Sequence, residues 1–211
     1  LFTFTSIFGT LSVQTTYTTT AKIVKKIGGK YLSVHTLANP HYDPHFIVPK
    51  PSLIAKLRRA DILVINGAGL ELGWLPPLLR GANNAKIKPE AKGFIDVSHC
   101  IDLLDKPSSV SRAFGDVHAQ GNPHYMLDPY NVPKVAKYIY EKLTIIDLKH
   151  KSYYKNNLET FLKDWQKFQQ SLDEKVSQCK SKKVVQYHEL FNYFLNRYNY
   201  VSYANIEPLP G

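Results

Sequence analysis

Two histidines and two acids lie close together in the stretch GDVHAQGNPHYMLDP, residues 115–129, and Pro123 directly precedes the second histidine. The proline ring fixes the backbone φ angle at that position, so the chain that carries His124 is stiffened. A metal ligand benefits from this, because a side chain that is already held in place loses less conformational freedom on binding. The stretch therefore indicates a metal site with His124 as a ligand.

Two further histidines follow predicted strands. His45 lies in a proline-rich loop, residues 39–52, after the predicted strand 31–37, and His188 ends the apolar stretch KKVVQYH. In open parallel sheets, ligands bind beyond the carboxyl ends of the strands. Three neutral imidazoles, completed by a carboxylate or water, form a site that suits zinc. We therefore expect His45, His124 and His188 to converge on one ion.

Other chemistries have weaker support. The sequence contains no HExxH, GxSxG, GxGxxG or GxxxxGK[ST] pattern. His41 and His45 have helical spacing, but the neighbouring prolines Pro40 and Pro44 exclude a regular helix there. A local site formed by His118 and His124 is an alternative to the three-histidine site.

The composition predicts a folded protein with a cationic surface. Of 211 residues, 44% are hydrophobic and 21% charged, which is typical of a chain with a packed core. The formal net charge of +10 comes from basic residues spread along the chain, without a long basic run or an RNA-binding aromatic motif. We therefore expect no nucleic-acid partner.

The compartment is suggested only weakly by the sequence. Cys100 and Cys179 are far apart and form no CxxC motif, so a disulfide and two separate thiols both stay open. No apolar run reaches the roughly 18 residues of a membrane-spanning helix. The first residues, LFTFTSIFGTLS, lack a basic segment and fit either the end of a secretory signal or a first strand. Export is favoured.

The elements that must position the histidines alternate along the chain. The pattern predicts strands at 11–16, 31–37, 61–67 and 93–98, helices at 18–29, 51–60 and 128–147, and a short helix pair broken at Pro76 and Pro77. Such alternation is typical of βαβ units with a parallel sheet covered by helices. A helical pattern without Gly or Pro then covers 151–180, and a strand–helix–strand pattern restarts after it.

We therefore expect an α/β protein with two lobes of parallel sheet flanked by helices, joined by one long rigid helix. Residues 1–148 form the N-terminal βα lobe, residues 149–180 the connecting helix, and residues 181–211 the start of a truncated C-terminal βα lobe. A lobe of that size buries too little apolar surface to be stable alone. Either it packs on the first lobe, or the natural protein continues beyond Gly211.

Several pieces of the chain occur together in the order of a known family: DPHFIVPKPS (43–52), ADILVINGAGLELGWLPPLL (60–79), GDVHAQGNPHYMLDP (115–129), VVQYHELFNYFLNRYN (184–199) and IEPLPG (206–211). With these pieces the chain resembles the substrate-binding proteins of ABC importers for zinc and manganese, the metal-receptor cluster. The resemblance covers most of the chain and agrees with two lobes joined by a rigid helix.

The resemblance implies metal ligands at His45, His124 and His188. Manganese-preferring members commonly have Glu at the last position, so His188 favours the zinc-type subgroup by ligand softness, with Mn²⁺ as the alternative cargo. The family's fourth ligand, an Asp or Glu, comes from beyond Gly211, so that segment or water completes the site. The long His-rich loop of many zinc members is absent.

In place of that loop stands VSRAFGDVHAQG, in which Asp116 and His118 are candidates for weak auxiliary metal ligands. The implied function is capture rather than catalysis. The implied receptor is periplasmic or otherwise extracytoplasmic, with a signal peptide or a lipoprotein anchor, and is expected to be a monomer. It delivers Zn²⁺ to an ABC permease and its ATPase subunit. Because a histidine must be neutral to bind metal, affinity should fall below about pH 6.5. The alternatives are a zinc hydrolase with Glu189 as base and a metal-stabilised surface adhesin.

Overall fold

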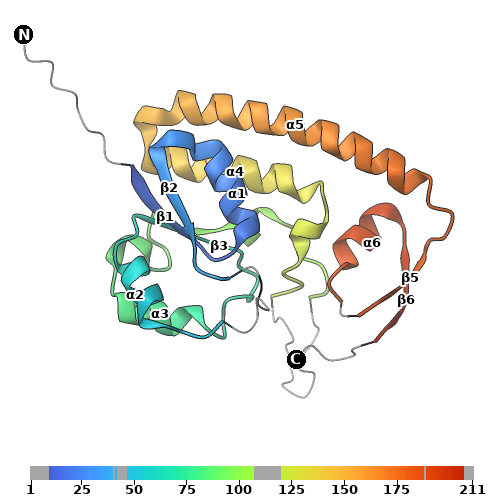
Figure 1. Ribbon diagram of the computed structural model, residues 1–211, viewed down its shortest axis with the longest axis horizontal. Coiled ribbons are helices and arrows are strands. Elements are labelled where there is room, and N and C mark those ends of the chain that lie inside the picture. The colour runs from blue at the N-terminus through green and yellow to red at the C-terminus, as the bar shows by residue number, and fades with distance from the viewer. Residues whose placement is uncertain (1–9, 40, 42–46, 107–119, 188, 207–211) are drawn as a thin grey trace, which may run out of the picture.

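The computed structural model of the chain describes residues 10–39, 41, 47–106, 120–187 and 189–206 (Figure 1). The larger, N-terminal part contains β1 (Leu11–Thr15), α1 (Thr18–Gly28), β2 (Leu32–Thr36), α2 (Pro51–Arg58), β3 (Ile62–Ile65), α3 (Leu75–Ala82), β4 (Phe94–Asp96) and α4 (Asn131–Ile146). It is followed by α5 (Lys151–Ser177), β5 (Lys183–Gln186), α6 (Asn192–Tyr198) and β6 (Val201–Asn205). The predicted α/β fold with a parallel sheet, flanking helices and a long helix is confirmed.

The first sheet is parallel throughout, with strand order β2-β1-β3-β4. Its central strand β3 has the sequence ILVI, and all four residues are buried, as expected for a strand covered on both faces. Val13 of β1 lies between Val34 of β2 and Ile62 of β3 in the register. Because the strands are parallel, the segments that follow them emerge at one edge of the sheet, where the candidate site lies.

Helices cover both faces of this sheet (Figure 1). On one face α1, α4 and α5 pack over a core that includes Val24, Ile139 and Tyr154. On the other face α2 and α3 pack over a second core that includes Leu57 and Trp74. The three-layer arrangement buries the apolar stripe of each helix, which explains why the sequence periodicity identified them.

The segment around Pro76 and Pro77 differs from its prediction. The prediction of a helix pair broken at these prolines is wrong. One helix, α3, runs from Leu75 to Ala82, and both prolines lie in its first turn. Backbone N–H groups in a first turn have no partner within the helix, so a proline there costs little. The predicted strand 93–98 is also shorter, because the Asp96 side chain accepts a hydrogen bond from the Ser98 N–H (2.9 Å) and starts a 3-10 turn.

The long helix α5 connects the first sheet with the C-terminal unit, which we define as β5, α6 and β6 (Figure 1). Strands β5 and β6 form a two-stranded parallel sheet. The exact boundaries of the two lobes stay a prediction. Within the described residues, none of the helices combines the length and apolar character needed to cross a membrane. Of the two alternatives for Cys100 and Cys179, the structure has two separate thiols and not a disulfide between them.

Candidate metal site

His124 lies at the carboxyl edge of the first sheet, in a segment that we call the His124 loop (residues 121–128). Asn66 directly follows β3 and contacts this loop twice. Its side-chain Nδ2 donates to the Pro123 carbonyl oxygen (3.1 Å), and its own carbonyl oxygen accepts from the Tyr125 hydroxyl (2.5 Å). Tyr125 is fully buried. The residue after the most buried strand thus positions the segment that carries His124.

The backbone at His124 is fixed by hydrogen bonds within the loop. The His124 N–H donates to Oδ1 of Asn122 (2.9 Å), which is the side-chain turn that Asn and Asp commonly form. The His124 carbonyl oxygen accepts from the N–H of Leu127 (3.0 Å), and a 3-10 turn follows from Tyr125 to Leu127. His124 itself is half-buried. The backbone that carries His124 is thus held in place, while the role of its imidazole as a ligand stays a prediction.

The other predicted ligands, His45 and His188, lie outside the described residues, as do the auxiliary candidates Asp116 and His118. Among the residues that the structure describes, no three His, Cys, Asp or Glu side chains are grouped closely enough to hold a metal ion. Convergence of the three histidines therefore stays a prediction. Glu189, which directly follows His188 in the sequence, does contact the His124 loop. Its carbonyl oxygen accepts a hydrogen bond from Asn122 Nδ2 (3.0 Å).

The acid at the end of the loop, Asp128, belongs to a contact with the C-terminal unit. Its buried carboxylate accepts three hydrogen bonds from Arg197 of α6, at 2.8 to 3.1 Å. The Arg197 guanidinium also lies over the Tyr130 ring, 4.7 Å from its centroid. The hydroxyls of Tyr130 and Tyr198 both donate to Asp173 of α5 (2.6 and 2.7 Å). This network joins the His124 loop, α5 and α6.

Glu71 is a buried acid at the same sheet edge that was not predicted as a site residue. Its carboxylate accepts hydrogen bonds from the Thr16 hydroxyl (2.7 Å) and from the backbone N–H groups of Asn66 (2.7 Å) and Gly67 (3.1 Å). Burial raises its pKa from 4.5 to about 7, and the nearby charge of Asp96 adds to this. The signal in the sequence was an acid within the glycine-rich turn NGAGLELG, directly after a buried strand.

The raised pKa of Glu71 predicts a pH-dependent free energy of unfolding. The folded chain binds this proton more tightly than the unfolded chain, so the stabilisation is complete below pH 4.5 and is lost as the pH rises through about 7. The full shift corresponds to about 3 kcal/mol. The titratable groups that face Glu71 are Asp96 and Tyr125. Denaturant unfolding between pH 4.5 and 8 should show this loss of stability.

The matched variants for this prediction are Glu71→Gln and Glu159→Gln. Glutamine does not titrate, so Glu71→Gln should flatten the pH profile relative to the wild type. Glu159 is exposed on α5 and its substitution should leave the profile unchanged. Equal pH profiles for the wild type and Glu71→Gln would contradict the shifted pKa.

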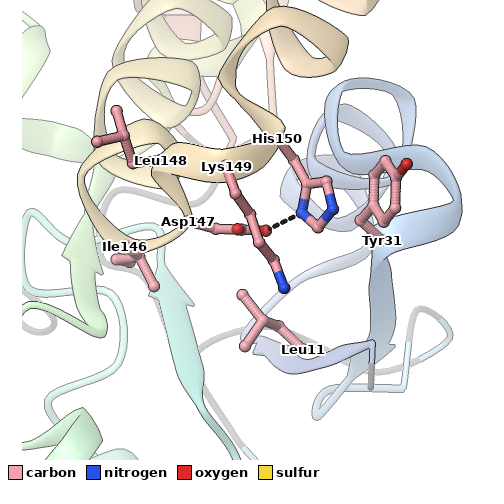
Figure 2. Close-up of a pocket in the computed structure, with 7 residues that line it drawn as sticks. All are labelled: Leu11, Tyr31, Ile146, Asp147, Leu148, Lys149 and His150. Atoms are coloured by element: carbon pink, nitrogen blue, oxygen red, sulfur yellow. Dashed lines mark hydrogen bonds and ion pairs between the residues drawn. The ribbon is translucent and has the colours of Figure 1, made fainter. Parts of the chain in front are cut away.

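Histidines outside the proposed ligand set have structural or surface positions. His35 lies exposed on β2, and His99 lies exposed beside Asp96, with nitrogen and oxygen 3.8 Å apart. His150 stacks on Tyr31, with ring centroids 3.5 Å apart, and its Nδ1 is 2.7 Å from the Asp147 carboxylate. Figure 2 shows Tyr31, Asp147 and His150 around a cavity of about 360 Å³ beside Leu11, at the amino end of β1. This cavity therefore lies away from the His124 edge.

Comparison with known proteins decides the family. The sequence profile of the family described as ZnuA, zinc-uptake complex component A, periplasmic, matches residues 13–209. The chain belongs to this family. The resemblance inferred from the quoted motifs is thereby confirmed at the level of the family.

Two curated relatives are named as substrate-binding lipoproteins of metal ABC transporters. The metal ABC transporter substrate-binding lipoprotein SloC of Streptococcus mutans is 29% identical over 194 residues, which cover 90% of this chain and 60% of SloC. The manganese ABC transporter substrate-binding lipoprotein PsaA of Streptococcus pneumoniae is 28% identical over 193 residues, covering 89% and 59%. The chain spans about 60% of the length of the curated relatives it matches. These relatives are binding proteins rather than enzymes, in agreement with the predicted capture role.

Solved structures of ZnuA-like proteins share the fold. A zinc-bound deletion mutant of ZnuA superposes with a TM-score of 0.79 at 28% identity, covering 92% of this chain and 69% of that protein. Zinc-bound AdcA from Streptococcus pneumoniae gives a TM-score of 0.76 at 25% identity, covering 93% and 39%. The relatives' names include both zinc and manganese, so the family is established and the choice of metal belongs to the proposal below.

Proposed function

We propose that this chain is the metal-capturing part of an extracytoplasmic receptor that binds Zn²⁺ and delivers it to an ABC-type permease and its ATPase subunit. The observation that carries the proposal is the His124 loop, in which a half-buried histidine is fixed at the carboxyl edge of a parallel sheet. Ligands bind at this edge in open α/β folds. The names of the relatives, which are substrate-binding lipoproteins of metal ABC transporters, support delivery to such a transporter and a lipid-anchored location.

The proposed ligands are His45, His124 and His188. A set of three imidazoles is softer than the carboxylate-rich sets that suit manganese, which supports Zn²⁺ as the cargo over Mn²⁺. Asp116 and His118 stay auxiliary candidates. A carboxylate from a further segment, or water, would complete a four-coordinate site.

A zinc hydrolase with Glu189 as general base has less support. The Glu189 carboxylate accepts a hydrogen bond from Asn205 of β6, with Oε1 and Nδ2 2.9 Å apart. Its carbonyl oxygen is bonded to Asn122. The Glu189 side chain is thus used within the C-terminal unit and its carbonyl oxygen in a contact with the His124 loop, and this favours capture over hydrolysis.

Titration calorimetry of the metal-free 211-residue chain tests the proposal. We expect saturable binding of one Zn²⁺ per chain, with Mn²⁺ bound at least about tenfold more weakly because of the imidazole donors. The absence of saturable binding for either metal would contradict the receptor function. Tighter binding of Mn²⁺ than of Zn²⁺ would contradict the choice of zinc alone.

A further inference from the structure

Asn122 is a buried residue whose side chain is fully used in hydrogen bonds between separate segments. It is 7% exposed. Its Oδ1 accepts from the His124 N–H (2.9 Å). Its Nδ2 donates to the Asp105 carboxylate (3.0 Å) and to the Glu189 carbonyl oxygen (3.0 Å). One amide side chain therefore joins the His124 loop to the segment around Asp105 in the N-terminal part and to the connection between β5 and α6 in the C-terminal unit.

The backbone of Asn122 is fixed as well. Its N–H donates to the Leu104 carbonyl oxygen (2.8 Å), and its carbonyl oxygen accepts from the buried hydroxyl of Tyr193 (2.7 Å). The Leu104 N–H in turn donates to the same Tyr193 oxygen (2.9 Å). Asn192, the neighbour of Tyr193 at the start of α6, donates to the Asp105 carboxylate (2.8 Å). The start of α6 and the His124 loop thus share two partners, Leu104 and Asp105.

We infer that Asn122 is a positioning residue for metal capture, which sets where the His124 backbone lies relative to the C-terminal unit. The inference rests on the proposed function. A metal ion accepts its nitrogen ligands only near 2.0–2.1 Å, so segments that carry ligands must be held at a fixed separation. Asn is suited to this position because it supplies one acceptor for His124 and two donors for Asp105 and Glu189. Groups that orient ligands in this way commonly change metal affinity by 10–100-fold.

Two substitutions separate the contacts that Asn122 makes. Asn122→Ala removes all three side-chain hydrogen bonds. Asn122→Asp keeps an acceptor for the His124 N–H but places oxygen against the acceptors of Asp105 and Glu189. We expect each variant to raise the zinc dissociation constant about tenfold or more, measured by competition with a chromogenic chelator. Zinc affinity equal to that of the wild type in both variants would overturn the inference.

Asn84→Ala is the matched structural control. Asn84 also makes three side-chain hydrogen bonds between segments, donating to the Leu57 and Ala60 carbonyl oxygens (2.9 and 2.7 Å) and accepting from Lys86 (3.0 Å). It lies away from the His124 loop. We expect a comparable loss of thermal stability with unchanged zinc affinity. A loss of zinc affinity as large as that of Asn122→Ala would show that the effect is general destabilisation and overturn the inference.

A rescue experiment tests whether the hydrogen bond between positions 122 and 105 itself carries the effect. In the double variant Asn122→Asp with Asp105→Asn, the donor and acceptor between positions 122 and 105 are exchanged, so this hydrogen bond can form again. The contact with Glu189 is not restored. We expect the double variant to recover part of the zinc affinity that Asn122→Asp loses. A double variant that binds zinc no better than Asn122→Asp would overturn the inference.

Amide hydrogen exchange of the metal-free chain distinguishes this inference from the proposed function. In Asn122→Ala, exchange should accelerate together in residues 124–127 and 191–195, because Asn122 bonds both sides. Acceleration on one side only would overturn the inference without any metal measurement. If the wild type fails to bind zinc, the proposed function fails, whereas wild-type zinc binding with unaffected Asn122 variants removes the positioning role alone.

Discussion

Replacing His124 by alanine is expected to weaken zinc binding roughly 100-fold or more while leaving the fold intact. A direct ligand contributes more than the surrounding groups, whose removal already costs 10–100-fold. His124 is only half-buried, and the loop is held by the hydrogen bonds of Asn66 with Pro123 and Tyr125, which the truncation does not remove. Chelator competition for the affinity and circular dichroism for the fold measure the two parts of this result.

His35→Ala is the control for this prediction, because His35 is exposed on β2 and its side chain contacts the neighbouring Ser33 hydroxyl. Its zinc affinity should equal that of the wild type. Losses of similar size are expected for His45→Ala and His188→Ala. If His124→Ala binds zinc as tightly as His35→Ala, the site proposed at the His124 loop is wrong.

Replacing Arg197 by methionine is expected to lower the free energy of unfolding by about 2–3 kcal/mol. Asp128 is buried, and methionine would leave its carboxylate without the charged partner that donates three hydrogen bonds. An unpaired buried carboxylate is costly, and full burial of both partners would raise the cost to 3–5 kcal/mol. The half-exposed position of Arg197 reduces this value, since water partly replaces the guanidinium. Urea unfolding of the two proteins measures the difference.

The ion pair between Lys86 and Asp61 provides the matched control. Its nitrogen and oxygen are 2.6 Å apart, but the lysine side chain is 68% exposed. Lys86→Met should therefore cost less than about 1 kcal/mol. A cost for Arg197→Met no larger than that for Lys86→Met would show that the link between α6 and the His124 loop contributes little to stability.

The layout of the sheet and helices could be predicted because its signals are local. The apolar run ILVI identifies β3, and the long polar and apolar repeat without Gly or Pro identifies α5. The prolines of α3 were misread because a proline can either break a helix or lie in the first turn of one. Only the position at which the helix begins decides between the two. Local patterns thus give the elements more securely than their boundaries.

The contacts that position the site could not be predicted in the same way. Arg197 and Asp128 are 69 residues apart in sequence, and Asn122 and Glu189 are 67 apart. No periodic pattern links such residues, because their contact depends on where α5 places the C-terminal unit relative to the first sheet. Glu71 was missed for a related reason, since its burial depends on segments from Thr16 and Asn66. His124 could be proposed as a ligand from the sequence because Pro123 marks it locally, and its ligand role stays a prediction.

Anomalous scattering at the zinc edge, from crystals of the chain grown with Zn²⁺, tests the central claim most directly. The account predicts one peak about 2.0–2.1 Å from a ring nitrogen of His124, with ring nitrogens of His45 and His188 at the same distance. A peak elsewhere in the molecule, or one at His124 from which the other two rings are too distant to bind, would contradict it.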